Sequence, residues 1–405
     1  MNPEIRGQFP SLSKQFNGKP CVYLDGPAGT QVPNSVIKII SNYYKNHNAN
    51  SGGSFITSLE SDAQMEQVRR KIAYFLGAPG PECISLGPNM TSLNYNLSQA
   101  IGAYLNPGDE IVITQIDHES NRAPWIHLQS KGIIIRELRM NSSGQWDMAH
   151  AKQIINSKTK LIACGLASNM NGEVHPVKAM RKLATVFGAW LLLDAVHYAA
   201  HFKIDVVDLD CDFLLCSAYK FYGPHVGILY SRKGLLDRLP TYRLRTAYQH
   251  APYKIETGTP NFAAYAGVKT AIEFIEDVGK KENATKGGHP LTMGWDIIKK
   301  HEKKLAKKLY NFLWSDLNVT VIGSAFGRKE RAPTISFYHK KLPASAICNA
   351  LAQENIFAWS GHFYALRSIE VLDLVKHGGV TRIGISMYTN EEDIAKTINA
   401  LKAIF

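Results

Sequence analysis

The pattern of apolar and polar positions divides the chain into two regions. Between about residues 20 and 235, short apolar runs alternate with segments whose apolar residues return every three or four positions. Runs such as "DEIVITQ", "TKLIACGLA" and "DFLLCSAYK" are almost continuously apolar, which is typical of parallel strands buried on both faces. Segments such as "VKAMRKLATVFG" have the spacing of amphipathic helices. This alternation predicts an α/β fold in which helices cover a mostly parallel sheet.

The second region begins near residue 260. There "NFAAYAGVKTAIEFIEDVG" predicts a long helix, and the polar "KKENATKGGHP" predicts a loop after it. Helix, two strands, helix, strand and a terminal helix are expected next, which is the order of a smaller α+β domain. We therefore predict four parts: an N-terminal arm at 1–19, a large domain at 20–265, a connecting helix and loop at 266–290, and a small C-terminal domain at 291–405.

Composition limits the location of the protein. In 405 residues no apolar run reaches the roughly 18 residues that a membrane span requires, and the start "MNPEIRGQFPSLSK" lacks the apolar centre of a signal peptide. We therefore expect a cytoplasmic protein that does not enter a membrane. The six cysteines include no C-x-x-C pair, so neither a zinc cage nor a disulfide framework is expected.

The formal net charge of +12 raises the question of an acidic partner. The densest basic cluster, "KKHEKKLAKKLYNFLW", carries leucines at helical spacing and lysines on the remaining faces. This pattern favours a solvated amphipathic helix, and the alternative is a docking surface for an acidic protein or nucleic acid. No nucleic-acid-binding motif accompanies it, so no nucleic-acid partner is predicted.

Several familiar motifs are missing from the sequence. There is no G-x-x-x-x-G-K-[ST], and no G-x-G-x-x-G opens a helix after a strand, which argues against ATP and NAD chemistry. "HYAAH" spaces His197 and His201 as two helical metal ligands would be, but the glutamate of H-E-x-x-H and a third ligand are lacking. We predict no metal site.

An acid and an amine follow two consecutive buried strands of the predicted sheet. Asp194 comes directly after "AWLLL", and Lys220 follows "DFLLCSAY". Ligands of open α/β sheets bind at the carboxyl ends of such strands. A lysine that forms a Schiff base and an aspartate that keeps a pyridine nitrogen protonated are the two groups that pyridoxal phosphate requires. The alternative is a structural Lys–Asp ion pair.

A phosphate group needs clustered donors, and a glycine-containing turn supplies them. In "LGPNMTSLNYNL", Asn89, Met90 and Thr91 enter a predicted helix, where backbone amides and the helix dipole favour an anion. Ser217 and Tyr219 can add hydroxyl donors. Read alone, Thr91 is equally consistent with a helix cap.

These residues resemble a known family. The segment from 191 to 230 is similar to the cofactor-lysine region of class V aminotransferase-fold enzymes, especially cysteine desulfurases and selenocysteine lyases. Other segments match the family in the same order: "YLDGPAGTQVP", "DHESNRAPW", "ASNMNGEVHP", "ETGTPN" and "TRIGISMYTNEED". The resemblance implies a pyridoxal-phosphate-dependent transferase of fold type I, with a mostly parallel seven-stranded sheet in the large domain.

The resemblance also implies roles for individual residues. Lys220 would be the Schiff-base lysine, Asp194 the partner of the pyridine nitrogen, and His118 the ring stacked on the cofactor. Asn169 would contact the ring hydroxyl together with His197, which replaces the glutamine usual in the family. The phosphate would be held by Met90, Thr91, Ser217, Tyr219 and, from the other subunit of a homodimer, Thr259. Arg382 would bind the substrate α-carboxylate through two parallel hydrogen bonds.

One departure from the family bears on the reaction. Cysteine desulfurases of this type carry a sulfur-accepting cysteine in the loop before the arginine strand, where this chain reads "FAWSGHFYALRS" with Tyr364 at that position. Trp359 also replaces an arginine often found there. We therefore expect a small L-amino acid as substrate and a β-elimination or C–S/C–Se cleavage without a persulfide. The alternatives are an aminotransferase, an epimerase, or a non-catalytic sulfur-assembly protein, and a sulfur-accepting partner protein stays open.

Overall fold

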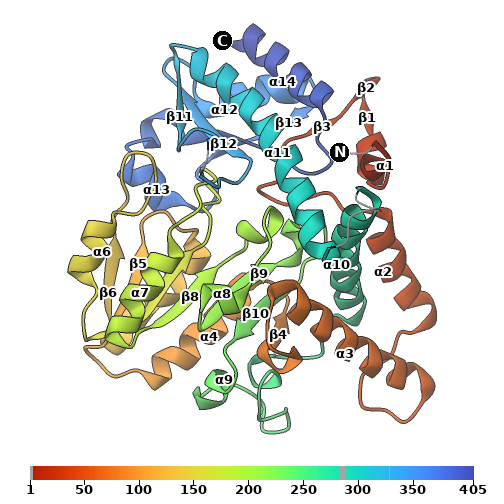
Figure 1. Ribbon diagram of the computed structural model, residues 1–405, viewed down its shortest axis with the longest axis vertical. Helices are drawn as coiled ribbons and strands as arrows, with labels where there is room; N and C mark the ends of the chain where they lie inside the picture. The colour runs from red at the N-terminus through yellow and green to blue at the C-terminus, as the bar shows by residue number, and fades with distance from the viewer. Residues whose placement is uncertain (1–2, 283–287, 328) are drawn as a thin grey trace.

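The computed structural model describes residues 3–282, 288–327 and 329–405. Its large part is built on a seven-stranded sheet in the order β4-β10-β9-β8-β7-β5-β6 (Figure 1). The strands are β4 (Ile84–Gly87), β5 (Glu110–Thr114), β6 (Ile134–Leu138), β7 (Thr159–Gly165), β8 (Trp190–Asp194), β9 (Phe213–Ser217) and β10 (Gly227–Ser231). Only β10 runs antiparallel to its neighbours, so the predicted mostly parallel seven-stranded sheet is confirmed.

Both faces of this sheet are covered, which explains why its strands read as continuously apolar. Along β8, Leu192 packs in the cluster that contains α4 (Met90–Tyr104), whereas Leu191 and Leu193 pack in the cluster that contains α7 (Val177–Phe187). Because successive residues of a strand point to opposite faces, both sets must be apolar. Shorter helices complete the cover: α5 (Ala123–Ile126), α6 (Met148–Ile154), α8 (Val206–Leu209) and α9 (Leu235–Arg238).

The C-terminal part contains a four-stranded antiparallel sheet in the order β11-β12-β15-β14. Its strands are β11 (Val319–Ile322), β12 (Thr334–His339), β14 (Trp359–Gly361) and β15 (Val380–Gly384). The helices α12 (Ala344–Gln353) and α14 (Glu391–Ile404) pack against it, and α13 (Leu366–Val371) precedes β15. This is the α+β arrangement that the sequence predicts for the region.

Four long helices pack together beside the large sheet: α2 (Asn34–Asn46), α3 (Ile56–Leu76), α10 (Phe262–Glu282) and α11 (Pro290–Ser315). Helix α10 packs against the other three, and α11 runs from the large part into the small one (Figure 1). Leu291 and Ile298 of α11 belong to the core of the large part, whereas Leu305 and Leu313 belong to that of the small part. Of the predicted connecting loop, residues 283–287 lie outside the described residues.

The N-terminal residues lie against both parts. After α1 (Pro3–Arg6) and the pair β1 (Gln15–Phe16) and β2 (Lys19–Pro20), strand β3 (Val22–Tyr23) pairs in parallel with β13 (Ile356–Phe357) of the C-terminal region. The chain then crosses to the large part, where the Thr30 amide donates to the Tyr219 carbonyl oxygen at 3.1 Å. Residues 1–2 of the predicted arm are outside the described residues. No helix in the described ranges has the length and apolar character of a membrane span.

Candidate active site

A cavity of about 520 Å³ lies at the carboxyl ends of β5, β7, β8 and β9, where the large and small parts meet. Open α/β sheets place ligands at this edge because several strand ends and helix starts converge there. The cavity is lined by almost all the residues that the sequence singled out: Met90, Thr91, His118, Asn169, Asp194, His197, Ser217, Tyr219, Lys220, Trp359, Tyr364 and Arg382. Thr259 is exposed and does not line it in this chain.

Lys220 lies in a short turn directly after β9 and is only 7% exposed. Its ammonium donates to the carbonyl oxygens of Pro27 and, at 3.1 Å, Ala28. No carboxylate forms a salt bridge with it in the described part of the chain. Burial, with a smaller effect of Arg382, lowers the pKa of the amine to about 7, although Asp194 acts in the opposite direction. A substantial fraction of the amine is therefore neutral near pH 7, as a nucleophile or proton acceptor must be.

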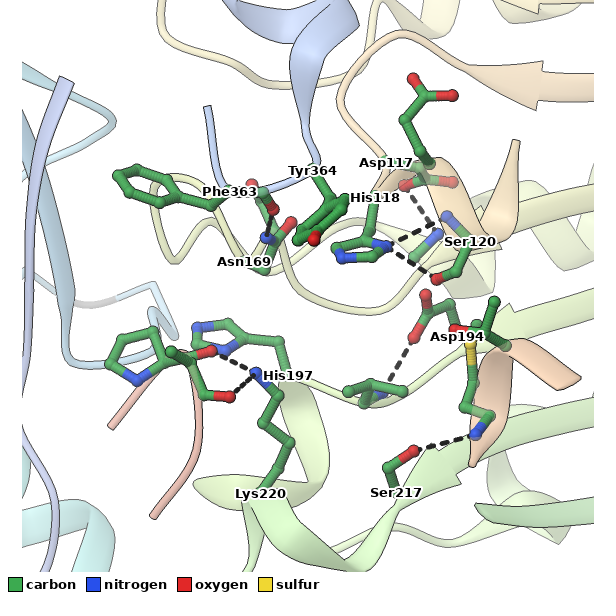
Figure 2. A pocket seen from close by; sticks show the side chains of 18 of the residues that line it. Asp117, His118, Ser120, Asn169, Asp194, His197, Ser217, Lys220, Phe363 and Tyr364 are labelled. Carbon is green, nitrogen blue, oxygen red and sulfur yellow. Dashed lines mark hydrogen bonds between the residues drawn. The ribbon is translucent and has the colours of Figure 1, made fainter. Parts of the chain in front are cut away.

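Asp194 ends β8 and is 8% exposed. One carboxylate oxygen accepts a hydrogen bond from the Val196 amide at 2.9 Å (Figure 2). Burial is the main cause that raises the pKa of this carboxyl group to about 7, and the neighbouring Asp117 adds to the effect. A cationic ligand placed beside Asp194 would therefore be strongly favoured, because it would stabilise the ionised form.

Asp117 belongs to the same site, and the sequence analysis missed it. It lies just after β5, as Asp194 lies at the end of β8, and burial raises its pKa to about 6. Its two oxygens accept from the Gly165 amide and from the Asn121 side chain, both at 3.0 Å. The available signal was a carboxylate directly after a buried strand, the same feature that singled out Asp194.

The imidazole of His118 forms one wall of the cavity. Its Nδ1 accepts from the Ser120 amide at 3.0 Å and lies 2.7 Å from the Ser120 hydroxyl, and its ring packs beside that of Tyr364 (Figure 2). Burial, followed by the charges of Lys220 and Arg382, lowers the pKa of His118 to about 4. The ring is therefore neutral at pH 7, and because Nδ1 is an acceptor, Nε2 carries the proton.

His197 and His201 lie close together, and each ring has a protein partner of its own. His197 Nε2 is 3.0 Å from the Thr334 hydroxyl, and burial lowers its pKa well below the ordinary value. His201 Nδ1 instead lies 2.9 Å from a carboxylate oxygen of Glu302 in α11. Within the described residues no group of three histidine, cysteine, aspartate or glutamate side chains could hold a metal ion.

Arg382 reaches the cavity from β15, one of the two inner strands of the small sheet. It is 3% exposed, and one terminal nitrogen donates to the Asn169 carbonyl oxygen at 2.9 Å. The guanidinium carbon lies 3.9 Å from the ring centroid of Phe363. Burial lowers its pKa to about 9, and no carboxylate forms a salt bridge with it among the described residues. A guanidinium of this kind is suited to bind a carboxylate ligand.

The start of α4 forms the opposite end of the cavity. Asn89 caps the helix by accepting from the Ser92 amide at 2.8 Å, and the Met90 amide donates to the Ser217 hydroxyl at 3.1 Å. Gly227 of β10 allows this close approach, because a Cβ there would lie 2.3 Å from the Asn89 carbonyl carbon. The first amides of a helix and nearby hydroxyls form a setting that favours an anion.

Tyr364 lies on the loop between β14 and α13. Its backbone carbonyl accepts from the Glu119 amide at 2.7 Å, which fixes the loop beside His118. All six cysteines of the chain are buried, and none of them is among the described residues that line the cavity. Phe363, which the sequence analysis also missed, covers Arg382 from this loop.

Residues 22–396 match the family described as Aminotransferase class-V. The chain belongs to this family. It is 31% identical to a probable cysteine desulfurase of Halalkalibacterium halodurans over 99% of this chain and 98% of the relative. It is 29% identical to the cysteine desulfurase of Pectobacterium carotovorum over 99% of this chain and 97% of the relative.

Solved structures agree with this assignment. The apo structure of cysteine desulfurase from Thermococcus onnurineus NA1 has a TM-score of 0.84 and 27% identity, covering 95% of this chain and 94% of that one. The structure of the Escherichia coli cysteine desulfurase CsdA, at 24% identity, has the same fold with a TM-score of 0.84 over 100% of this chain. The resemblance that the motifs indicated is confirmed, and the chain is a pyridoxal-phosphate-dependent, cysteine desulfurase-like enzyme of the class V aminotransferase fold.

The cavity fits pyridoxal phosphate in three respects. It places a buried amine and a buried carboxylate, Lys220 and Asp194, neither of which has a salt-bridge partner among the described residues. It adds the start of α4 and Ser217 at one end, as an anion requires. It also has the neutral imidazole of His118 as a flat wall. Lys220 would hold the aldehyde, Asp194 the ring nitrogen, and the α4 end the phosphate.

Proposed function

We propose that this enzyme breaks the bond between the β-carbon of a small free L-amino acid and its β-substituent, by β-elimination or C–S/C–Se cleavage, without a persulfide on the protein. The observation that carries the proposal is the composition of the cavity wall. Among the described residues it contains Lys220, Asp194 and Arg382, but a tyrosine and no cysteine on the loop before β15. A phenol cannot accept sulfur as a persulfide. A β-elimination needs no sulfur acceptor on the protein, because the substituent leaves as a free product.

Each side chain of the cavity has a separate role in the proposed reaction. Arg382 binds the substrate α-carboxylate with the donors that the Asn169 carbonyl leaves free, and so orients the α-carbon–hydrogen bond. The neutral amine of Lys220 accepts the α-proton. Bound pyridoxal phosphate supplies an electron sink for the pair that the α-proton leaves behind, and the Asp194 carboxylate keeps its ring nitrogen protonated. His118 covers one side of the site and excludes water.

The products distinguish the candidate reactions. We expect the purified, cofactor-supplemented enzyme to convert L-cysteine, or a β-substituted alanine, into pyruvate, ammonium and the free substituent, without an added thiol. The assay measures sulfide, alanine and pyruvate from cysteine, cysteine sulfinate and alanine. Lys220→Ala is the matched control and should abolish the release of pyruvate, ammonium and the substituent.

Other outcomes would contradict the proposal in different ways. Alanine with protein-bound sulfur would indicate desulfuration by another route. Keto-acid formation that depends on an amino acceptor would indicate an aminotransferase, and loss of optical purity without product release would indicate an epimerase. No turnover of any amino acid, together with tight and salt-sensitive binding of a partner protein, would indicate the non-catalytic role.

A further inference from the structure

The phenol of Tyr364 is directed into the cavity. Figure 2 shows its hydroxyl oxygen pointing toward the space beside Asn169 and His118, with Lys220 on the opposite side of that space. The ring centroids of Tyr364 and His118 are 5.3 Å apart, so the imidazole supports the phenol from one side. No hydrogen bond to the phenolic oxygen is formed by the part of the chain that the structure describes. The hydroxyl is therefore available to a ligand.

The loop that carries this phenol is held at its backbone. The Tyr364 carbonyl oxygen accepts from the Glu119 amide at 2.7 Å, and the Phe363 carbonyl oxygen accepts from the Asn169 side chain at 2.9 Å. Both Phe363 and Tyr364 adopt left-handed backbone conformations, with φ of 52° and 60°. Such conformations are unfavourable for residues other than glycine and persist where the surroundings fix them. Strained backbone conformations of this kind are often found at active sites and ligand-binding sites.

Helix α13 adds a second attachment immediately after the loop. Arg367 donates to the Glu137 carboxylate at 3.0 Å, and the Ser368 hydroxyl donates to the Gln115 carbonyl oxygen at 3.0 Å. Glu137 also binds Arg122, which follows His118 in the same segment, at 2.7 Å. The loop is thus tied to the segment that carries His118, which fixes the backbone of Tyr364 relative to the cavity wall.

We propose that Tyr364 is a catalytic acid that protonates the leaving atom of the substrate's β-substituent. The proposal rests on the elimination proposed above. Lys220 takes the α-proton, and the electron pair of that C–H bond becomes the second bond between the α- and β-carbons. The bond from the β-carbon to the leaving atom breaks, and its electron pair stays with that atom, which takes the phenolic proton. The phenolate recovers a proton from water, to which Tyr364 is 67% exposed.

The position of the other groups favours this assignment. His118 is neutral with its proton on Nε2, and a neutral imidazole is a weaker proton donor than a phenol. Lys220 lies on the opposite side of the cavity, where it accepts the α-proton (Figure 2). Glu119 lines the cavity near Tyr364, but its carboxylate is paired with Arg122 at 3.2 Å.

The test compares two substrates that differ in how much the leaving atom needs a proton. Chloride departs from β-chloro-L-alanine unprotonated, whereas methanethiolate from S-methyl-L-cysteine is a poor leaving group that benefits from protonation. In Tyr364→Phe we expect kcat/KM for S-methyl-L-cysteine to fall by ~10²–10⁴-fold, the usual contribution of general acid catalysis. The value for β-chloro-L-alanine should change by less than about threefold, and exchange of the α-hydrogen with deuterated water should be retained.

A matched control removes another phenol from the same protein. Tyr104 is half-exposed at the far end of α4, against Trp190, and does not line the cavity, so Tyr104→Phe should leave both substrates unaffected. An equal loss for both substrates in Tyr364→Phe, or a loss for neither, would overturn the catalytic-acid role while the elimination itself stands. Failure of the unaltered enzyme to release pyruvate even from β-chloro-L-alanine would overturn the proposed function, and this inference with it.

Discussion

At the scale of single residues, the site depends on two buried ionisable groups that lack fixed ionic partners. Burial moves the pKa of Lys220 down and that of Asp194 up, both to about 7. An ion pair between them would have stabilised both charged forms and left the amine protonated and unreactive. Their separation leaves each group available to a ligand that carries an aldehyde and a ring cation.

The lowered pKa of Lys220 predicts how the cofactor-free enzyme reacts with an amine reagent. Trinitrobenzenesulfonate modifies only neutral amines, so the rate at Lys220 should rise between pH 6 and 8 and then level off, since burial lowers its pKa to about 7. Mass spectrometry of the peptide that contains residue 220 measures this rate. Arg382→Gln should move the midpoint upward, because a positive neighbour is removed. If the curve of modification rate against pH had its midpoint above pH 9 in the unaltered protein, burial would not lower the pKa of Lys220 as proposed.

At the scale of elements, the sequence predicted the parallel strands, the long helices and the residues at the strand ends. These features follow from local periodicity and from the rule that buried parallel strands are apolar on both faces. The antiparallel direction of β10 and the pairing of β3 with β13 could not be predicted, because they depend on contacts between distant segments. The left-handed conformation of Phe363 and Tyr364 was also hidden, since no glycine marks it.

The hydrogen bonds that attach α13 to the large part predict how replacing Glu137 affects stability. Burial acts to raise the pKa of Glu137, but hydrogen bonds from Arg367, Gln115 and Arg122 lower it to about 2. Glu137→Gln should therefore reduce the free energy of unfolding by about 1.5–3 kcal/mol at pH 7, the range for hydrogen bonds to charged groups. It should also increase hydrogen exchange in residues 361–371.

The pH dependence of that loss has a defined direction. The native pKa of Glu137 lies below the unfolded value of about 4.3, so its contribution is complete above that pH and disappears as the pH falls toward 2. The difference in the free energy of unfolding between the unaltered protein and Glu137→Gln should therefore become smaller as the pH is lowered from 6 to 3 in denaturant titrations. A difference that is independent of pH would show that the carboxylate charge is not what holds α13.

At the scale of the whole molecule, one exposed residue suggests that the site extends beyond a single chain. Thr259, which the family resemblance assigns to the phosphate of another subunit, does not line the cavity of its own chain. A nearby segment exposes large apolar side chains, including Tyr242, Leu244 and Tyr248 at 74%, 71% and 68%. We propose a homodimer in which this surface is covered and Thr259 completes the partner's site.

Mixed dimers test this arrangement directly. Lys220→Ala and Thr259→Asp should each be inactive alone, the second because a carboxylate repels the phosphate. After the two variants are mixed, unfolded and refolded together, a heterodimer contains one site with both substitutions and one with neither. Roughly a quarter of the unaltered activity should return, since half of the dimers are mixed and each has one intact site. Activity that stays at zero would place Thr259 outside the partner's site.

The parallel pair β3 and β13 has a consequence for biosynthesis. The ribosome completes Val22 long before it reaches Ile356, yet these two residues lie opposite one another in the folded protein. The two-stranded sheet of β3 and β13 therefore cannot form in a nascent chain that lacks residues 356–357, nor in a chain from which residues 1–24 have been removed. An affinity tag or a domain fused at the N-terminus should accordingly be joined through a linker long enough to leave β3 free to pair with β13.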